Sequence, residues 1–457
     1  MEKLTTTEIA KAVFGKVNIE KEVYGCEIDN RRVQPQSLFI CIKGERFDGH
    51  DFAESAVEEG AVAVMCEKEL NLPENIAQII VSDTSKAFLQ FANYYRRKFD
   101  IPFVGVTGSV GKTTVKDMIH ALLSQKNKTL KTEGNLNNQI GLPRTLMELD
   151  KTYDYAVIEM GMNHRGEIST LSLISQVDIA VINNIGTSHI GNLGSKENIM
   201  KAKLEILDGM ERSSTLILNG DDELLSKYKN EEYKVVFFGI DNEKAAYTAK
   251  NIKFEDEYTS YTLCSKQGEF EIKLPSFGKH GVLNSLAAFS VISELGLDIS
   301  DYKDGLENFL STGMREKHIK IGDIMFIEDC YNASPDSVRA AINTLNSKKN
   351  HRKIFVFGDM LELGQMSKQA HIDVGIQAAK MDIDMVLCLG VYSELTARSA
   401  KENGVKISKS FDSKTKLAEY LYDNLQSGDV VTFKASRGIK LEQVAKMVYD
   451  MMEEDKK

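Results

Sequence analysis

The stretch of the chain richest in potential chemistry runs from Val104 to Thr114 and reads Val-Gly-Val-Thr-Gly-Ser-Val-Gly-Lys-Thr-Thr. The lack of bulk at Gly108 and Gly111 lets backbone N–H groups converge on phosphate oxygens, and a helix starting at Lys112 adds the positive end of its dipole. The Lys112 ammonium would lie along the outer phosphates, while the Thr113 hydroxyl could bind the magnesium ion that bridges them. This pattern predicts a site for ATP or GTP, formed by Thr107, Gly108, Ser109, Val110, Gly111, Lys112, Thr113 and Thr114.

The loop departs from the usual phosphate-binding spacing. The strict pattern G-x-x-x-x-G-K-[ST] places a glycine at position 106, where this chain has valine, and Gly105 and Gly108 flank it instead. We therefore interpret it as a shortened relative of that loop, with a buried strand before it and a helix after it. A glycine-rich turn in front of an ordinary helix is the structural alternative.

The size and composition of the chain restrict what else it can be. A length of 457 residues suggests about three domains. The net charge of −10 argues against non-specific nucleic-acid binding, which needs a basic face. The six cysteines form no C-x-x-C pair and are predicted to be reduced and mostly buried in a cytosolic protein. The sequence contains no run of about 18 apolar residues, so we expect no membrane span.

Hydrophobic periodicity predicts an α/β fold in three parts. The first, residues 1–98, is expected to be a small α/β unit with helices at 1–14, 51–59 and 86–99 and strands at 37–42 and 61–65. The second, residues 99–312, has the pattern of a mostly parallel sheet, with strands at 103–106, 155–160, 177–183 and 215–218. The third, residues 313–457, is expected to have strands at 324–327, 353–357, 385–389 and 429–433.

Polar residues at the ends of the central strands are candidate ligand contacts, because ligands gather at the carboxyl ends of parallel strands. Glu159, Asn183 and Asn184 occupy such positions. The Glu159 carboxylate suits magnesium, or alternatively caps a neighbouring turn. His189 follows in the next loop, where it is a second candidate ligand or orienting group.

The helix expected at residues 195–207 carries a lysine where an apolar residue is expected. With Ser195 as its N-cap and about 100° per residue, Lys203 falls in the middle of the apolar face made by Ile199, Ile206, Leu207 and Met210. Such a lysine must extend to the surface, find a partner or lose its proton. A neutral amine can add carbon dioxide to form a carbamate, an acidic group that could bind a second magnesium ion.

Two further segments are polar enough to bind ligands. The loop at residues 43–51 is rich in charge, and a solvated turn is the alternative. Asn284 lies in the first part of a helix that begins near residue 278, where its amide could read an adenine edge or only cap the helix.

Taken together, these motifs resemble those of the Mur ligases, ATP-dependent amide-forming enzymes of peptidoglycan synthesis. The resemblance covers essentially the whole chain, and the Gly-Asn-x-Asn-Asn loop is most similar to members that add D-alanyl-D-alanine to UDP-N-acetylmuramoyl-tripeptide. The motifs are residues 107–114, 133–143 (Glu-Gly-Asn-Leu-Asn-Asn-Gln-Ile-Gly-Leu-Pro), 158–161, 188–189 with 202–203, Asn284, 313–315, 329–333, 358–360 and 434–437.

The resemblance implies an architecture and an activity. Residues 1–98 would bind the UDP-sugar-peptide, residues 99–312 would form the central ATPase domain with the phosphate loop, and residues 313–457 would form a Rossmann-like domain that binds the incoming dipeptide. ATP would convert a carboxylate to an acyl phosphate, which the amine of D-alanyl-D-alanine then attacks, releasing phosphate. Such an ADP-forming acid–D-amino-acid ligase would complete the last cytoplasmic step of peptidoglycan precursor synthesis, and we expect a cytoplasmic monomer with no nucleic-acid partner.

The resemblance also implies roles for individual residues. Catalysis would depend on Lys112, Glu159, His189, Lys203 and Arg315. Magnesium would be bound by Thr113 and Glu159, with a second ion near His189 and carbamylated Lys203. Besides the phosphate loop, the nucleotide would contact Asn284, Arg315, Asp329, Tyr331 and Asn332. Substrate contacts would come from Ser37, Lys43, Asp48, His50, Asn135, Asn137, Asn138, Lys434 and Arg437.

Two departures from the family pattern bear on substrate contacts and on the hinge. Asp29-Asn-Arg31 stands where the family usually has Asp-Ser-Arg or Asp-Thr-Arg, and Gly313-Met-Arg315 replaces the usual Pro-Gly-Arg. The alternatives are a sister ligase that adds a single amino acid, a folate polyglutamate ligase, or a nucleotide-dependent switch without ligase activity. The third residue of the substrate peptide, lysine or diaminopimelate, is left open.

Overall fold

The computed structural model describes residues 1–255, 258–275, 278–307, 309, 315–348 and 350–454. By the density of its internal contacts, the chain divides into two compact units. The first consists of Met1–Thr107, Lys126–Ala180 and Leu204–Thr215, and the second of Gly108–Gln125, Val181–Lys203 and Leu216–Lys457. The boundary predicted at residues 312 and 313 lies outside the described residues, as do Gly313 and Met314 of the expected hinge motif.

The first unit begins with a small sheet in the order β2-β7-β6-β5-β4. All its strand pairs are parallel except β2 with β7. The helix expected at residues 1–14 is shorter, because Leu4–Thr5 pairs with Glu22–Val23 and the Thr5 side chain caps the helix that follows. The elements are β1 (Leu4–Thr5), α1 (Thr6–Ala12), β2 (Lys16–Val17), β3 (Glu22–Val23), β4 (Gly25–Glu27), β5 (Ser37–Ile40), α2 (Ala53–Glu58), β6 (Ala61–Cys66), β7 (Ala77–Ile80) and α3 (Thr84–Arg96).

The same unit contains three parallel strands, with β10 (Tyr155–Glu159) between β8 (Phe103–Thr107) and β9 (Thr129–Lys131). The unit also contains α5 (Gly141–Met147), α6 (Glu167–Ser175) and the 3₁₀ helices η1 (Asn30–Arg32), η2 (Gly49–Phe52) and η3 (Glu205–Gly209). Arg96 of α3 links these parts, since its guanidinium donates to the carbonyls of Ser175 and Gln176 and lies 3.6 Å from the ring centroid of Phe103.

The second unit contains a run of strands in the order β16-β15-β14-β13-β12-β11. The pairs β14–β15 and β15–β16 are antiparallel, a local exception to the mostly parallel sheet that the sequence predicts. The elements are α4 (Lys112–Leu123), β11 (Ile179–Ile182), α7 (Ile190–Leu193), α8 (Lys196–Leu204), β12 (Thr215–Asn219), β13 (Lys234–Gly239), β14 (Tyr247–Phe254), β15 (Thr259–Ser265), β16 (Gly268–Leu274), α9 (Gly278–Glu294) and α10 (Ile299–Tyr302).

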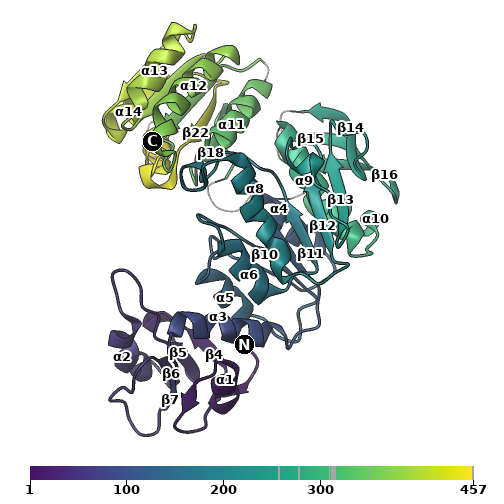
Figure 1. Ribbon diagram of the computed structural model, residues 1–457. Coiled ribbons are helices and arrows are strands. Elements are labelled where there is room, and N and C mark those ends of the chain that lie inside the picture. Colours follow the sequence, from purple (N-terminus) through teal and green to yellow (C-terminus); the bar gives the residue numbers. More distant parts are fainter. Residues whose placement is uncertain (256–257, 276–277, 308, 310–314, 349, 455–457) are drawn as a thin grey trace. The chain divides into compact units, whose positions relative to one another are not determined.

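The end of the second unit is a sheet in the order β17-β18-β22-β19-β20-β21, parallel except for β17, with helices on both faces (Figure 1). Residues of α11, α12 and α13 pack on one face, and residues of α14 and α15 on the other. The elements are β17 (Lys317–Ile321), β18 (Ile324–Asp329), α11 (Pro335–Ser347), β19 (Lys353–Gly358), α12 (Ser367–Lys380), β20 (Met385–Leu389), α13 (Ser393–Glu402), β21 (Ile407–Phe411), α14 (Lys414–Asn424), β22 (Val430–Lys434) and α15 (Glu442–Glu454). Because the last strand, β22, lies between β18 and β19, three loops meet at neighbouring carboxyl ends.

The cysteines and the helices agree with the expectations from composition. Each of the six cysteines is free, and Cys41, Cys66, Cys330 and Cys388 are buried. Burial raises the pKa of the Cys66 thiol to about 11, so it stays protonated near neutral pH. Within the described residues, none of the helices combines the length and the apolar character that a membrane crossing requires.

A partly buried histidine in β17 predicts a loss of stability in acid. Burial lowers the pKa of His318 to about 4, although Glu316 opposes the shift. The unfolded chain binds this proton near pH 6.5, so stability should fall as the pH drops from about 6.5 towards 4, by about 1–2 kcal/mol at pH 5. Denaturant unfolding of the protein and of His318→Gln at pH 7.5 and pH 5 measures the difference. His164→Gln, at an exposed position, is the control, and equal pH dependence in all three proteins would contradict the assignment.

Candidate active site

The loop that joins β8 to α4 has the conformation expected of a phosphate-binding turn. Gly111 precedes the helix in the left-handed region, with φ 82°. The first intrahelical bond of α4 runs from Val115 N–H to the Gly111 carbonyl, so the N–H groups before it have no intrahelical acceptor. Together with the helix dipole, this first turn has the polarity that phosphate groups need.

Two consecutive asparagines after β11 hold this loop. Asn184 Oδ1 accepts from the N–H groups of Ser109 (3.2 Å) and Val110 (2.9 Å), and its Nδ2 donates to the Val110 carbonyl (2.9 Å). Asn183 Nδ2 donates to the same carbonyl (3.0 Å) and to Asn284 Oδ1 of α9 (2.8 Å). Both asparagines predicted at the strand end, and Asn284, are therefore brought to the phosphate loop.

The same asparagines explain why the loop needs its glycines. A Cβ atom at Gly111 would lie 2.5 Å from Asn183 Nδ2 and 2.8 Å from Asn284 Oδ1. A Cβ atom at Gly108 would lie 3.0 Å from the Cβ atom of Asn183. Any side chain at Gly111 would have to displace an amide that holds the loop, so the spacing of the glycines follows from this packing.

Two lysines, Lys112 and Lys203, belong to the same compact unit as the loop, and their surroundings differ. The Lys112 ammonium folds back onto it and donates to the Gly108 carbonyl at 2.8 Å. Lys203 of α8 is only 2% exposed, as its position on the apolar face predicts. Burial, followed by the charge of Lys112, lowers the pKa of Lys203 well below its usual value. The structure therefore favours the neutral amine at Lys203.

Glu159 is a buried carboxylate at the end of β10, and the asparagine loop holds it. It is 1% exposed; its carboxylate accepts from Asn137 Nδ2 at 2.7 Å, and its backbone N–H donates to Thr132 Oγ1 at 3.0 Å. A Cβ atom on Gly161 would lie 2.9 Å from the Asn137 side chain, so the glycine after the strand makes room for this contact. Asn138 instead holds the turn before α5, where its Oδ1 accepts from the N–H groups of Ile140 at 3.1 Å and Gly141 at 2.8 Å, and Asn135 is exposed.

His189 lies immediately before α7 in the left-handed region, with φ 62°. A non-glycine residue in this region is uncommon and is often found at functional sites. Its side chain is 17% exposed, and it belongs to the same compact unit as the phosphate loop and Lys203.

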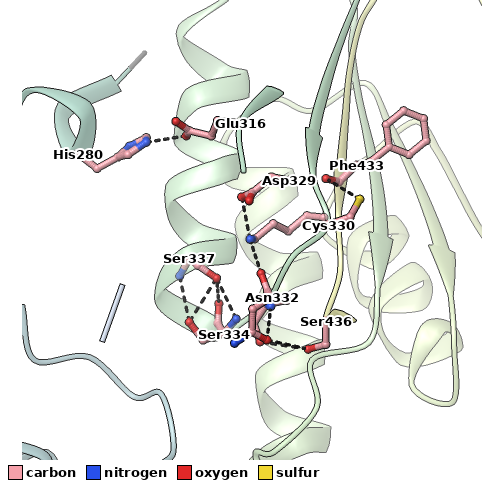
Figure 2. Close-up of polar contacts among 11 residues, drawn as sticks. His280, Glu316, Asp329, Cys330, Asn332, Ser334, Ser337, Phe433 and Ser436 are labelled. Atoms are coloured by element: carbon pink, nitrogen blue, oxygen red, sulfur yellow. Dashed lines mark hydrogen bonds and ion pairs between the residues drawn. The ribbon is translucent and has the colours of Figure 1, made fainter. Parts of the chain in front are cut away.

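Of the predicted nucleotide contacts, Asp329, Tyr331 and Asn332 lie at or just after the end of β18, whereas Arg315 precedes β17. The Arg315 guanidinium stacks on the ring of Tyr331, 3.7 Å from its centroid, while Asn332 is exposed. Asp329 pairs with Lys434 at 2.7 Å, and the same ammonium donates to the Asn332 carbonyl at 2.5 Å (Figure 2). Burial raises the pKa of Asp329, and the Lys434 charge opposes that shift. Lys434, expected to face the incoming dipeptide, therefore lies buried as a bridge between two loops.

The predicted substrate contacts of the first sheet come from β5 and the loop after it. Ser37 is buried in β5, and Lys43 is exposed. Asp48 Oδ1 accepts from the His50 N–H and lies 2.6 Å from His50 Nδ1, and these contacts lower the pKa of Asp48. Because the Glu67 N–H donates to His50 Nε2, the His50 proton resides on Nδ1. Arg437, the second expected dipeptide contact, is exposed and pairs with Glu442 at 2.9 Å.

Sequence reasoning missed two residues that hold predicted site residues in place. Thr132 bonds the backbone of Glu159, and His371 of α12 accepts from the Met360 N–H at 3.1 Å. A single histidine or threonine outside any motif gives no spacing signal, so only the tertiary contacts identify these two. Among the described residues, no group of three or more His, Cys, Asp or Glu side chains is arranged to hold a metal ion.

Comparison with known protein families matches three consecutive segments of the chain. Residues 22–104 match the model described as the Mur ligase family, catalytic domain. Residues 106–292 match the Mur ligase middle domain, and residues 314–437 match the Mur ligase, glutamate ligase domain. These matches cover most of the sequence.

Individual relatives are similar over almost their whole length. A UDP-N-acetylmuramoyl-tripeptide--D-alanyl-D-alanine ligase of Bacillus subtilis is 40% identical over 454 residues, covering 98% of both chains. The ligase of the same name from Escherichia coli is 35% identical, covering 92% of this chain and 93% of that protein. A crystal structure of MurF from Acinetobacter baumannii has a TM-score of 0.91 at 32% identity, covering 99% of both chains. MurF ligase from Thermotoga maritima in complex with ADP has a TM-score of 0.84 at 29% identity, covering 95% of this chain and 99% of that chain.

The geometry of Gly111 predicts the effect of adding one methyl group. Gly111→Ala should weaken the binding of a nucleoside triphosphate by at least about tenfold, because the methyl group must displace Asn183 or Asn284. Gly166→Ala is the matched control, since Gly166 has a similar φ of 86° and no atom within 4 Å of the added carbon. Calorimetric titration with a non-hydrolysable ATP analogue measures both variants. Equal losses in the two would assign the effect to backbone strain alone.

Proposed function

The chain belongs to the Mur ligase family, and we propose that it joins D-alanyl-D-alanine to UDP-N-acetylmuramoyl-tripeptide with hydrolysis of ATP to ADP and phosphate. The proposal rests mainly on the similarity of this chain, over nearly its full length, to ligases named for this reaction. The Gly-Asn-x-Asn-Asn loop at residues 134–138 supports the same substrate, and its Asn137 holds Glu159. A related structure with bound ADP supports ATP as the nucleotide.

The chemistry requires activation of a carboxylate, because an oxygen anion is a poor leaving group for attack by an amine. A carboxylate oxygen of the tripeptide attacks the γ-phosphorus of ATP, the bond to the bridging oxygen breaks, and ADP leaves with an acyl phosphate formed. The dipeptide amine then attacks the acyl carbon and loses a proton. Phosphate leaves from the tetrahedral intermediate, and an amide bond remains.

The residues of the phosphate loop suit the first step. The loop backbone and the first turn of α4 would bind the phosphates, and Lys112 would swing from the Gly108 carbonyl to the transferred group, where it offsets charge. Arg315 would contact the γ-phosphate, while Asn284, Asp329, Tyr331 and Asn332 would contact adenosine. Stacking of Arg315 on Tyr331 keeps these two side chains together before the nucleotide binds.

Magnesium is part of the proposal, with Thr113 and Glu159 as ligands of one ion and His189 and carbamylated Lys203 near a second. A bound magnesium ion neutralises phosphate charge and needs few protein groups, because it keeps water and phosphate oxygens as ligands. The residues present fit that chemistry: Glu159 is a buried carboxylate, and Lys203 is a buried amine whose lowered pKa favours the neutral form that reacts with carbon dioxide.

The remaining assignments follow the family. Residues 1–98 would bind the UDP end through Ser37, Lys43, Asp48 and His50, and Asn135, Asn137 and Asn138 would line the path of the sugar-peptide. Residues 99–312 would bind ATP. Residues 313–457, with Lys434 and Arg437, would bind the incoming dipeptide. We propose that the enzyme acts as a monomer in the cytoplasm, at the last step of precursor synthesis there.

The function is tested by release of ADP from the purified protein. With ATP, magnesium, UDP-N-acetylmuramoyl-tripeptide and D-alanyl-D-alanine, we expect steady ADP release and a product heavier by one dipeptide less water in the mass spectrum. Omitting either acceptor substrate should reduce turnover by at least about a hundredfold, since water is excluded from the activated intermediate. ADP release at full rate without the nucleotide-sugar peptide would favour a nucleotide-dependent switch, and amide formation with a single amino acid would favour a sister ligase.

The carbamate is tested on Lys203 itself. Native mass spectrometry in bicarbonate buffer should show an adduct of one carbon dioxide that Lys203→Ala lacks and that the neighbouring, exposed Lys201→Ala keeps. Lys203→Ala should lose at least about a hundredfold in kcat, because it removes a charged group from the transition state. Addition of a short carboxylic acid should restore part of that activity. An unmodified Lys203 together with full activity of the alanine variant would refute the carbamate.

A further inference from the structure

Three loops at the carboxyl ends of β22, β19 and β20 are tied together by hydrogen bonds. The central loop, after β19, contains Asp359, whose carboxylate accepts from the Val391 N–H at 2.6 Å and from the Tyr392 N–H at 3.2 Å after β20. Towards β22, the Asp359 carbonyl accepts from the Ser436 N–H at 3.2 Å. The Leu361 N–H donates to Ser436 Oγ at 2.9 Å. The position of the loop after β22 therefore depends on the loop after β19.

A histidine of α12 fixes the middle of this central loop. His371 is 0% exposed; its Nε2 lies 3.1 Å from the Met360 nitrogen, and its Nδ1 lies 2.6 Å from the Ser367 carbonyl oxygen. A backbone N–H can only donate and a carbonyl can only accept, so the two contacts require a neutral ring with its proton on Nδ1. His371 thus connects the start of α12 to the amide of Met360. Met360 lies between Asp359 and Leu361, the two residues whose backbones bond Ser436.

The surroundings of the ring keep it neutral and fixed. Its centroid lies 4.8 Å from that of Tyr392 and 5.6 Å from that of Phe357. Asp359 is the nearest carboxylate, with Oδ1 at 3.5 Å from Nε2. Burial lowers the pKa of His371, although the Ser367 carbonyl and the Asp359 charge oppose the shift. A protonated ring would place a second N–H against the Met360 N–H and break that contact.

The two residues assigned above to the incoming dipeptide lie at the end of β22, where Lys434 is the last residue of the strand, and in the loop after it, which contains Arg437. Ser436 lies between them and is 3% exposed. It is held from two directions, by the loop after β19 and by the Ala333 carbonyl, which accepts from Ser436 Oγ at 3.4 Å. Figure 2 shows Ser436 beside Asn332 of the loop after β18, which is assigned above to adenosine. Ser436 therefore contacts that loop as well as the loop after β19.

We propose that His371 is a positioning residue for the second substrate: by holding the Met360 amide, it sets the loop after β19 and, through Ser436, the loop that binds D-alanyl-D-alanine. The inference rests on the proposed function. His371 is fully buried, so it would act by positioning the loop backbone and not by contacting the substrate itself. Its effect should be larger on the binding of the dipeptide than on the binding of ATP.

Two amide substitutions separate the two hydrogen bonds of the ring. In His371→Gln, the longer side chain can place its carbonyl oxygen near the Nε2 position and accept from Met360. In His371→Asn, the shorter side chain can place its N–H₂ group near the Nδ1 position and donate to Ser367, while the Met360 bond is lost. We expect His371→Asn to raise the KM for D-alanyl-D-alanine by about tenfold, the effect of one lost buried hydrogen bond, and His371→Gln by less than about threefold.

The KM for ATP should rise less than the KM for the dipeptide in both variants, because the amides that hold the phosphate loop, those of Asn183, Asn184 and Asn284, bond that loop and one another and do not depend on the loop after β19. His351→Asn is the matched control. The His351 ring bonds the backbone carbonyl of Gly428 and precedes β19, so it lies at the other end of the same sheet. The kinetics of this variant should match those of the parent protein. Hydrogen exchange on all proteins supplies a readout that needs no substrate. Peptides containing Met360 and Ser436 should exchange faster in His371→Asn than in His371→Gln.

Three results would overturn the proposal while the parent protein remains an active ligase. These are an equal rise in the dipeptide KM in both variants, a parallel rise in the KM for ATP, and unchanged exchange at Met360 and Ser436 in His371→Asn. The first two would mean that the ring only supports the packing of α12. Absence of amide formation by the parent protein would instead refute the proposed function, so the two failures are distinguishable.

Discussion

The packing of three asparagine amides against a glycine turn is the constraint on which the phosphate loop depends. Asn183 and Asn184 follow a buried strand, and Asn284 comes from a helix 101 positions after Asn183 in the chain. Their amides bond the loop and one another at distances that leave no room for a side chain at Gly111. The loop is held in its turn by side chains from elsewhere in the unit, and this preorganisation is what a site for phosphate charge requires.

Burial and the charge of Lys112 both lower the pKa of Lys203. Two amines in one unit would repel each other if both were charged, and burial acts in the same direction on Lys203. A carbamate would replace an unfavourable cation with an anion, which magnesium and the nearby Lys112 would stabilise. In the first unit, Glu159 is kept buried and oriented by Asn137 and Thr132. An oriented carboxylate loses less freedom when it binds a metal ion.

In the C-terminal sheet, too, buried polar side chains hold loops in place by bonding to their backbone groups. Its last strand lies between the first and second parallel strands, so loops that are distant in sequence become neighbours. Buried polar side chains, among them Asp359, Ser436, Lys434 and His371, then link these loops. Each of these side chains has a hydrogen-bond or ion-pair partner. A buried polar group with such a partner helps to specify the structure, whereas one without a partner would destabilise the folded state. The loops are thereby held relative to one another before any ligand arrives.

Local spacing was sufficient to predict the strand, turn and helix around Lys112, the burial of Lys203 and the α/β class, because each depends on residues within a few turns of one another. Resemblance of motifs extended this to the family, which the comparisons confirmed. The sequence did not reveal the antiparallel strands β14–β16, the bond from Asn137 to Glu159, the burial of Lys434 beside Asp329, or the bond from the Met360 N–H to His371. Those features arise only when segments far apart in the chain meet, and hydrogen bonds between such segments leave no periodic trace in the sequence.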